Sequence, residues 1–438
     1  MERKIYQKLK AWKDAGAKKP LLLIGARQIG KTYTTLEFCK KEFTKYFAFN
    51  LLDRADIVSL FAENLNTQEK INKLELIVGE KIDFENTAIF FDEVQESEPL
   101  ISALKYFAES ETSYKIICAG SLLGVKLRRF GSSFPVGKVE MLDMFPMDFE
   151  EYMRAHGEAG LAEEIRNCFI DMSCMSAPLH KKCLIRFREY LCVGGMPEAV
   201  ADIVIKQGDI LSFDSNILEN IYRSYLSDMH RYIISPLEAS RIDAVYHSIP
   251  AQLGNQSRKF QYSKIRQGAR GRSYESALEW LVASGMVYRC VSSPIPEAPL
   301  KGYAEEGQFK LFLNDPGILR SLLGLRSSEV MLDGNYKYKG ILTESYVAGQ
   351  FVNAGLPLYY WRCENMAEVD FLLDTPDGIA PVEVKSGEKK RSASMDVYNR
   401  KFSPKSIYRI SANNFGKTGN IISIPLYAAH LFSVFRFS

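Results

Sequence analysis

The sequence predicts an α/β fold whose first 150 residues form a parallel sheet with helices on both faces. Short apolar runs alternate with helical stretches from Leu21 to about Pro146, an alternation typical of parallel βαβ units. A glycine-rich loop follows the first run and two carboxylates end the third, at the sheet edge where open α/β folds bind ligands. The expected strands are Leu21–Ile24, Tyr46–Asn50, Ala88–Phe91, Lys115–Cys118 and Val139–Leu142.

Before the first strand, Ile5, Leu9 and Trp12 recur at helical spacing among lysines. This pattern predicts an amphipathic surface helix rather than a secretory signal.

The loop after the first strand is a complete phosphate-binding motif, G-x-x-x-x-G-K-[ST], and a helical segment (Tyr33–Lys41) follows it. Glycines let successive backbone N–H groups point at phosphates, and a helix N-terminus adds partial positive charge. We expect Lys31 to reach the β- and γ-phosphates and the Thr32 hydroxyl to hold Mg²⁺. The alternative is a glycine-rich turn that binds nothing, but the full motif in this setting favours ATP with Mg²⁺. The binding loop comprises Gly25, Ala26, Arg27, Gln28, Ile29, Gly30, Lys31 and Thr32.

The third strand ends in Asp92 and Glu93. Two carboxylates after an apolar run are costly to bury unless they meet a cation or water. We expect Asp92 to bind Mg²⁺, directly or through water, and Glu93 to polarise the attacking water, which distinguishes a hydrolase from a nucleotide binder. The alternative is a helix N-terminus, which favours acidic side chains because of its dipole.

The fourth strand leads to Ser121, which we expect to contact the γ-phosphate or to orient the water, although an ordinary turn explains Gly120-Ser121 equally well. The basic residues beyond it are candidates for neutralising phosphate charge, from the same chain or from a neighbouring copy in a homo-oligomer. Most surface cations only solvate a fold. The candidates are Lys126, Arg128, Arg129 and Lys138.

Composition limits the other possibilities. A chain of 438 residues has room for about three domains, and a net charge of +3 means that any basic surface must be local. The eight cysteines include no C-x-x-C pair, as expected of reduced thiols in a cytoplasmic protein. No uninterrupted apolar stretch reaches about 18 residues, so no membrane span is expected.

The chain after residue 150 predicts a helical lid (151–200) and a helical, winged-helix domain (201–300). The lid ends at the strong breaker Gly194-Gly195-Met196-Pro197. Residues 257–272 carry no acidic side chain and are followed by an amphipathic helix (Tyr274–Ser284) and a strand (Met286–Val291). Helix, turn, helix and strand in this order are typical of a winged helix, whose basic run with Phe260 and Tyr262 would face DNA phosphates. The alternatives are a solvated basic loop and a winged helix used only for domain packing.

The last part, 301–438, contains two strand-like runs, Glu368–Leu373 and Ala380–Val384, joined by Pro376-Asp377-Gly378. A two-residue loop at Pro376-Asp377 would place Asp370 opposite Glu383. A loop at Asp377-Gly378 would instead place Asp370 opposite Lys385.

Either register puts Asp370, Glu383 and Lys385 on one face, because side chains alternate along a strand. Two carboxylates and a lysine there would hold Mg²⁺ and an attacking water beside a phosphodiester. Glu344, on an expected helix Leu342–Asn353, is a further candidate ligand. The plain alternative is a structural salt bridge between Asp370 and Lys385.

Together these motifs resemble a prokaryotic group of AAA+-type ATPases with a C-terminal domain of unknown function. The resemblance covers almost the whole chain and implies an AAA+ core, a winged-helix segment and an α/β tail similar to the PD-(D/E)xK, restriction-endonuclease-like fold. In that superfamily the counterparts of Asp370 and Glu383 bind metal and the counterpart of Lys385 assists catalysis. Val369 stands where the proline of the superfamily's name would be, and Lys138 where many relatives carry an arginine. The matching segments are 19–32, 90–95, 119–121, 134–140, 194–198, 368–371 and 382–387.

The expected function is ATP binding and hydrolysis coupled to the winged-helix and nuclease-like regions, with DNA or a protein as partner. The alternative is an ATP-gated switch that binds DNA or protein through a catalytically inactive nuclease-like tail.

Overall fold

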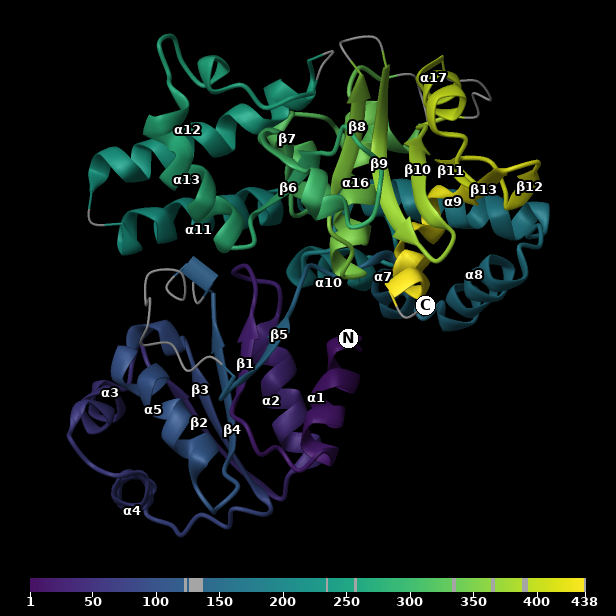
Figure 1. The fold of residues 1–438 in the computed structure, drawn as a ribbon. Helices are drawn as coiled ribbons and strands as arrows, with labels where there is room; N and C mark the ends of the chain where they lie inside the picture. Colours follow the sequence, from purple (N-terminus) through teal and green to yellow (C-terminus); the bar gives the residue numbers. More distant parts are fainter. Residues whose placement is uncertain are drawn as a thin grey trace. The chain divides into compact units, whose positions relative to one another are not determined.

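The computed structural model describes residues 1–121, 124–125, 137–233, 235–255, 258–332, 336–363, 367–387 and 393–436. They divide into two compact units (Figure 1). The first comprises residues 2–145 with 283–285, and the second comprises residues 146–282 and 286–438 together with residue 1. The expected boundary at residue 150 lies close to this division, whereas those after residues 200 and 300 fall inside the second unit.

The first unit is built on the predicted parallel sheet. Its strand order is β2-β3-β4-β1-β5, and every neighbouring pair is parallel. Each of the five expected strands is confirmed to within two residues at its ends. Their bounds are β1 Leu21–Ile24, β2 Lys45–Asn50, β3 Thr87–Asp92, β4 Lys115–Gly120 and β5 Glu140–Asp143.

Helices cover both faces of this sheet, as the pattern predicts. Leu22, Phe91 and Cys118 belong to one apolar cluster with residues of three helices, α3 (Ala55–Ala62), α4 (Thr67–Val78) and α5 (Glu98–Glu109). Figure 1 shows α1 (Ile5–Asp14) and α2 (Lys31–Glu42) on the opposite side. The amphipathic helix predicted around Ile5, Leu9 and Trp12 is therefore confirmed, because all three side chains of α1 are buried.

The second unit begins with a helical part. Its helices are α7 Phe149–Ala155, α8 Ala159–Asp171, α9 Ala177–Val193, α10 Pro197–Ile205, α11 Asn216–Tyr232, α12 Pro236–Leu253 and α13 Gly271–Ala283. Further along the chain follow α14 Pro316–Leu322, α15 Ser327–Met331, α16 Lys339–Asn353 and α17 Ala393–Phe402.

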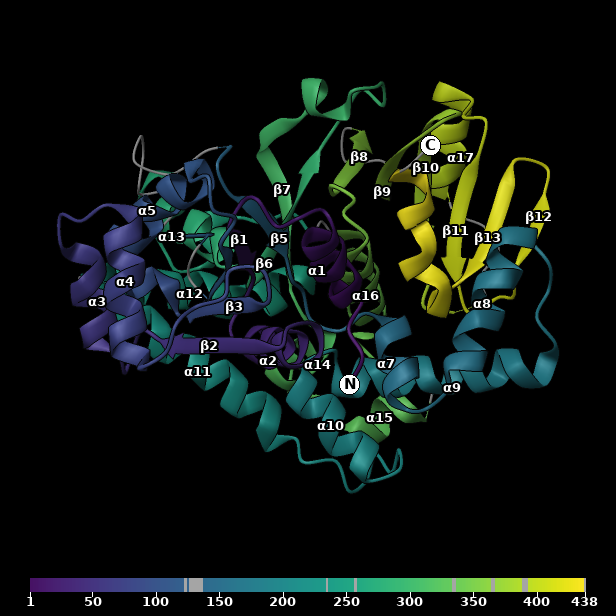
Figure 2. The ribbon, with the colours of Figure 1, turned by 90° about the horizontal axis from the view of Figure 1, so that it is seen from below.

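A mixed eight-stranded sheet, in the order β12-β13-β11-β10-β9-β8-β6-β7, forms the rest of this unit. Figure 2 shows β11, β13 and β12 side by side at one end. The antiparallel pair β6–β7 follows α13, as expected of a winged helix, but β6 also pairs with β8. The sheet therefore continues across the expected boundary at residue 300. The bounds are β6 Val287–Ser292, β7 Glu305–Leu313, β8 Tyr359–Cys363, β9 Ala367–Thr375, β10 Gly378–Val384, β11 Ile407–Ser411, β12 Gly416–Thr418 and β13 Ile421–Pro425.

The breaker Gly194-Gly195 is a docking point for α14. Gly194 has φ +80°, and a Cβ there would lie 2.1 Å from Oδ1 of Asp315. The Gly195 N–H donates to Oδ2 of Asp315 at 2.6 Å, and the N–H of Ile318 donates to Oδ1 at 3.0 Å. Asp315 therefore caps α14 and holds the end of α9 with the same buried carboxylate.

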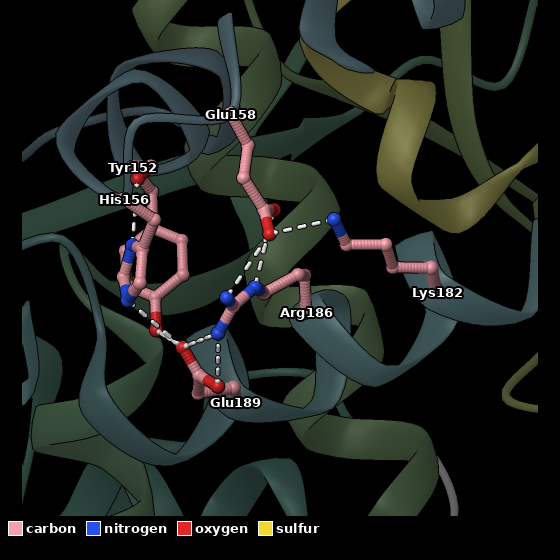
Figure 3. Close-up of polar contacts among 6 residues, drawn as sticks. All are labelled: Tyr152, His156, Glu158, Lys182, Arg186 and Glu189. Atoms are coloured by element: carbon pink, nitrogen blue, oxygen red, sulfur yellow. Dashed lines mark hydrogen bonds and ion pairs between the residues drawn. The ribbon is translucent and has the colours of Figure 1, made fainter. Parts of the chain in front are cut away.

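A buried network of charged side chains joins α7 and α9 (Figure 3). Glu189 accepts hydrogen bonds from Tyr152 and Arg186, and its Oε1 lies 3.0 Å from Nε2 of His156. Arg186 also donates two hydrogen bonds to Glu158. Because every carboxylate in the network has a basic partner, the cost of burying it is offset.

All eight cysteines are free thiols. Among the described residues, no helix combines the length and the apolar character that a bilayer crossing requires.

Candidate nucleotide site

The phosphate-binding loop joins β1 to α2, with its two glycines in conformations that other residues rarely adopt. Gly25 has φ +150° and Gly30 has φ +91°. A Cβ on Gly25 would lie 2.1 Å from the carbonyl oxygen of Met144, so only glycine fits there. Close packing against Met144 therefore requires glycine at position 25, in addition to the predicted role of the loop at phosphates.

Lys31 and Thr32 begin α2 beside the acidic end of β3. Lys31 is buried, and its Nζ donates to the carbonyls of Gly25 at 2.9 Å and Ala26 at 2.7 Å. The exposed Thr32 donates its hydroxyl to Oδ2 of Asp92 at 2.6 Å. The structure thus brings the two predicted Mg²⁺ ligands together across 60 residues of chain.

Asp92 is a suitable group for a cation. Burial raises its pKa, and the hydrogen bond from Thr32 opposes that shift. A buried carboxylate whose ionised form is disfavoured gains most when a cation pairs with it. Oxygen ligands from Thr32 and Asp92, completed by phosphate oxygens and water, match the preference of Mg²⁺.

Glu93 lies directly after β3 in the left-handed region, with φ 52° and ψ 44°. Ser121, directly after β4, places its Oγ 3.4 Å from Oε2 of Glu93. The two residues expected to handle the attacking water are therefore neighbours in space.

Two contacts in this unit were not expected from the sequence. Gln95 is fully buried and donates from Nε2 to Oε2 of Glu93. Arg3 donates from Nη1 to the carbonyl of Ile29 in the loop at 2.8 Å, and from Nη2 to the carbonyl of Phe145 at 2.7 Å. The only signal for Gln95 was its place directly after the acidic pair, and nothing in the sequence distinguished Arg3 from its basic neighbours.

The candidate cations gain no support as phosphate partners. Lys138 is exposed and forms an ion pair with Glu109 at 2.9 Å. Lys126, Arg128 and Arg129 lie outside the described residues.

In the second unit, the hairpin β9–β10 has the first of the two predicted registers. Thr375 pairs with Gly378 and Phe371 with Val382, so the loop is Pro376-Asp377. The register with the loop at Asp377-Gly378 is therefore wrong. Asp370 accepts a hydrogen bond from the N–H of Val384 at 2.8 Å.

The nuclease-like carboxylates are paired with basic side chains of the same unit. Arg258 contacts Glu344 and lies 3.7 Å from Asp370, while the fully buried Lys310 lies 3.1 Å from Glu344. Glu383 lies 3.0 Å from Lys385 and 3.5 Å from Arg409. The ion pair of Lys385 is thus with Glu383, and the alternative salt bridge with Asp370 is not formed.

Within the part of the chain that the structure describes, no group of three or more His, Cys, Asp or Glu side chains is placed to hold a metal ion. Glu344, Asp370 and Glu383 are therefore not gathered into such a group, and their role as metal ligands stays a prediction. Sequence reasoning missed Lys310 and Arg258 as their partners, although a lysine inside the apolar run Phe309–Leu313 was a signal for the first.

Only part of the basic run 258–272 is exposed. Phe260 is buried and stacks on Phe309 with ring centroids 5.6 Å apart, so the expectation that it faces phosphates is wrong. Tyr262 packs edge-on against Phe260. Four basic residues remain exposed, with no ion pair recorded to another described residue: Lys264, Arg266, Arg270 and Arg272.

Family models match three segments of the chain. Residues 17–153 match a model described as an AAA domain, so the first unit is an AAA-type P-loop domain. Residues 185–329 and 339–428 match two domains of unknown function, DUF8612 and DUF4143. No curated protein matches the chain significantly.

Solved structures with a similar arrangement include a Walker-type ATPase of Pyrococcus abyssi, at 16% identity and TM-score 0.44, over 73% of this chain and 95% of that one. The ORC2 protein of Aeropyrum pernix is 11% identical at TM-score 0.39, over 75% and 92% of the two chains. Cdc6p of Pyrobaculum aerophilum is 10% identical at TM-score 0.27, over 76% and 96%. Similarity at this level says nothing about what this chain binds.

Proposed function

We propose that the AAA-type domain of this chain binds ATP with Mg²⁺ and hydrolyses it. The observation that carries the proposal is the meeting of the Thr32 hydroxyl and the Asp92 carboxylate, 2.6 Å apart, directly beside a complete phosphate-binding loop. Neither the loop nor the acidic strand end alone requires hydrolysis. Their contact supports a shared Mg²⁺ ion beside the phosphates of a nucleotide on the loop.

Each predicted residue of the site has a role that follows from its chemistry. Lys31 exchanges two backbone carbonyls for phosphate oxygens, and so keeps its charge compensated while it binds. Thr32 and Asp92 would hold Mg²⁺, which would neutralise charge on the phosphates. Glu93 accepts the proton of the attacking water, and Ser121 restrains its carboxylate.

Calorimetry and turnover assays on Lys31→Ala and Glu93→Gln test the proposal. Lys31→Ala should weaken Mg·ATP binding at least 10-fold, because a charge-assisted contact to phosphate is worth roughly 1.5–3 kcal/mol. Glu93→Gln should bind ATP normally and lose at least 100-fold in turnover, the usual contribution of a general base. Lys41→Ala, an exposed lysine of the same helix, should change neither quantity.

No heat of binding from well-folded wild type with Mg·ATP would remove the proposal altogether. Normal turnover by Glu93→Gln would remove Glu93 as the base.

We further propose that the second unit binds DNA without cutting it, as a switch governed by the nucleotide. Two observations support this choice over a nuclease. Glu344, Asp370 and Glu383 are each paired with a basic side chain, and four exposed basic residues near the start of α13 have no ion pair within the described part of the chain. A carboxylate with a basic partner must give up that partner before it can bind a metal ion, whereas exposed cations release counterions when they meet phosphates.

DNA binding measured against salt tests this second proposal. Replacing Lys264, Arg266, Arg270 and Arg272 with Ala should lower the affinity and flatten the salt dependence by roughly 0.9 for each phosphate that is no longer neutralised. Replacing the exposed Lys181 and Lys417 should have no such effect. Plasmid should stay intact with Mg²⁺ or Mn²⁺, and cleavage that Asp370→Ala abolishes would contradict the proposal. Recovery of a protein partner, with no DNA binding, would contradict it as well.

A further inference from the structure

We infer that Gln95 is a positioning residue for ATP hydrolysis, holding Glu93 so that one chosen oxygen faces the water. The inference rests on the proposed ATPase function. It concerns a residue that contacts the general base and not the nucleotide.

The backbone around Glu93 is built to aim its side chain. A non-glycine residue in the left-handed region costs of the order of 1 kcal/mol or more and persists only where its surroundings impose it. Here the N–H of Glu93 donates to Oδ1 of Asp92 at 3.1 Å, and its carbonyl accepts from Glu96 at 3.0 Å. These bonds fix Glu93 at the start of a short 3₁₀ turn, Val94–Glu96.

Gln95 lies at the centre of that turn. It is fully buried. The turn is held at its end by Ser97, whose N–H donates to the carbonyl of Val94 at 3.1 Å and whose Oγ caps α5 by accepting from Leu100 at 3.3 Å. A buried side chain on a turn held in this way has less rotational freedom to lose when it restrains a neighbour.

The hydrogen bonds from described residues reach only one of the two oxygens of the Glu93 carboxylate. Gln95 donates from Nε2 to Oε2, and Ser121 lies 3.4 Å from the same oxygen. No donor to Oε1 is recorded among the described residues. Oε1 is therefore the oxygen left to accept the proton of a water molecule.

A neutral amide suits this task better than a charged donor. A lysine or arginine at position 95 would form a salt bridge with Glu93 and compete with the water molecule for its oxygens. A carboxylate would repel it. Glutamine restrains the base and leaves its charge in place.

Steady-state kinetics of Gln95→Met test the inference, because methionine keeps the length and apolar packing of glutamine and removes the amide. We expect kcat to fall 10- to 100-fold while KM and the calorimetric affinity for Mg·ATP stay within twofold. Gln95→Glu, which has the same shape, should lose at least as much. Val58→Ala, a half-buried position of α3 outside the site, controls for a general loss of packing.

A double-mutant cycle separates positioning from mere structure. If Gln95 acts through Glu93, adding Gln95→Met to Glu93→Gln should change the residual turnover less than twofold. The same fold-loss in both backgrounds would overturn the inference, as would wild-type kcat in both Gln95→Met and Gln95→Glu. Wild-type protein that binds ATP without turning it over would overturn both the hydrolysis proposal and this inference. The outcomes named before it leave wild-type turnover intact and overturn the inference alone, so the two failures are distinguishable.

Discussion

Single residues that link distant segments decide how the nucleotide site is held. Arg3 is buried, and its guanidinium donates both to the phosphate-binding loop and to Phe145, the last residue of the first unit before Pro146. A planar group with several donors suits two carbonyls at once, which a lysine does not. Arg3 therefore connects the loop to the chain segment that leaves the domain.

Arg3→Ala should weaken both stability and nucleotide binding. Two carbonyls lose a charged donor, so we expect a loss of roughly 1–3 kcal/mol in the free energy of unfolding, measured by urea denaturation. The affinity for Mg·ATP should fall, because Ile29 is no longer fixed. Arg3→Lys should recover only part of either effect. Lys8→Ala, on the exposed face of α1, should match wild type. An Arg3→Ala variant with wild-type stability and affinity would show that the Arg3 contacts contribute to neither.

In the second unit, Glu189 is likewise a single residue that links distant segments. Burial works against its ionisation, but hydrogen bonds from His156 and Tyr152 and the charge of Arg186 outweigh burial and lower its pKa. A carboxyl group whose pKa is lowered by folding stabilises the protein above its ordinary value near 4.5. That stabilisation is lost as the pH falls through the lower, folded-state value.

The free energy of unfolding should therefore decrease as the pH falls below about 4.5, and Glu189→Gln should weaken that dependence. Above this range the variant should cost about 3 kcal/mol, the low end for breaking a buried pair, because Arg186 keeps Glu158 as a partner. Denaturation at several pH values measures both effects. Glu163→Gln, an exposed position of α8, should leave the pH profile as in wild type.

At the scale of elements, the junction of α9 and α14 depends on one carboxylate. Asp315→Asn replaces one acceptor oxygen by an NH₂ group, so the N–H of Gly195 or of Ile318 would face a donor. We expect a loss of roughly 1–3 kcal/mol in the free energy of unfolding. Asp209→Asn, on an exposed turn, is the control. A stability equal to that of wild type would mean that the helix cap contributes nothing.

The same residue gives a pH dependence opposite to that of Glu189. Burial raises the pKa of Asp315 to about 6. Between about 4 and 6 the folded state holds a proton that the unfolded state releases, so stability should fall as the pH rises, by at most about 3 kcal/mol. Asp315→Asn should remove this slope, and an unchanged slope would assign it to another group.

Elements with a local pattern were predictable, and contacts between distant residues were not. The five strands of the first sheet and the glycine-rich loop carry their signals within a few adjacent residues. Arg3 meets Phe145 across 142 positions, and Arg258 meets Glu344 through the tertiary fold, so no spacing rule indicates either. The hairpin register was ambiguous because both loops satisfy turn chemistry. The observed loop places Pro376 first, where its fixed φ suits a turn.

At the scale of the whole molecule, the eight-stranded sheet argues against separating the chain at residue 300. A fragment of residues 301–438 would lose β6, leaving β7 and β8 without the strand between them. Exposed strand edges favour aggregation. We expect this fragment to be largely insoluble and residues 146–438 to be soluble and cooperatively folded, as measured by sedimentation and thermal unfolding. A monomeric 301–438 fragment with native stability would contradict this expectation.

The placement of β6 between β7 and β8 also constrains recombination. A chimera that joins two related parents at residue 300 would lay a strand of one parent between two strands of the other. Folding of such a chimera would then depend on whether the side chains on neighbouring strands from the two parents pack together. It would not depend only on whether two separate domains are compatible. Crossovers placed before Val287 avoid that mismatch, since the whole sheet is then inherited from one parent.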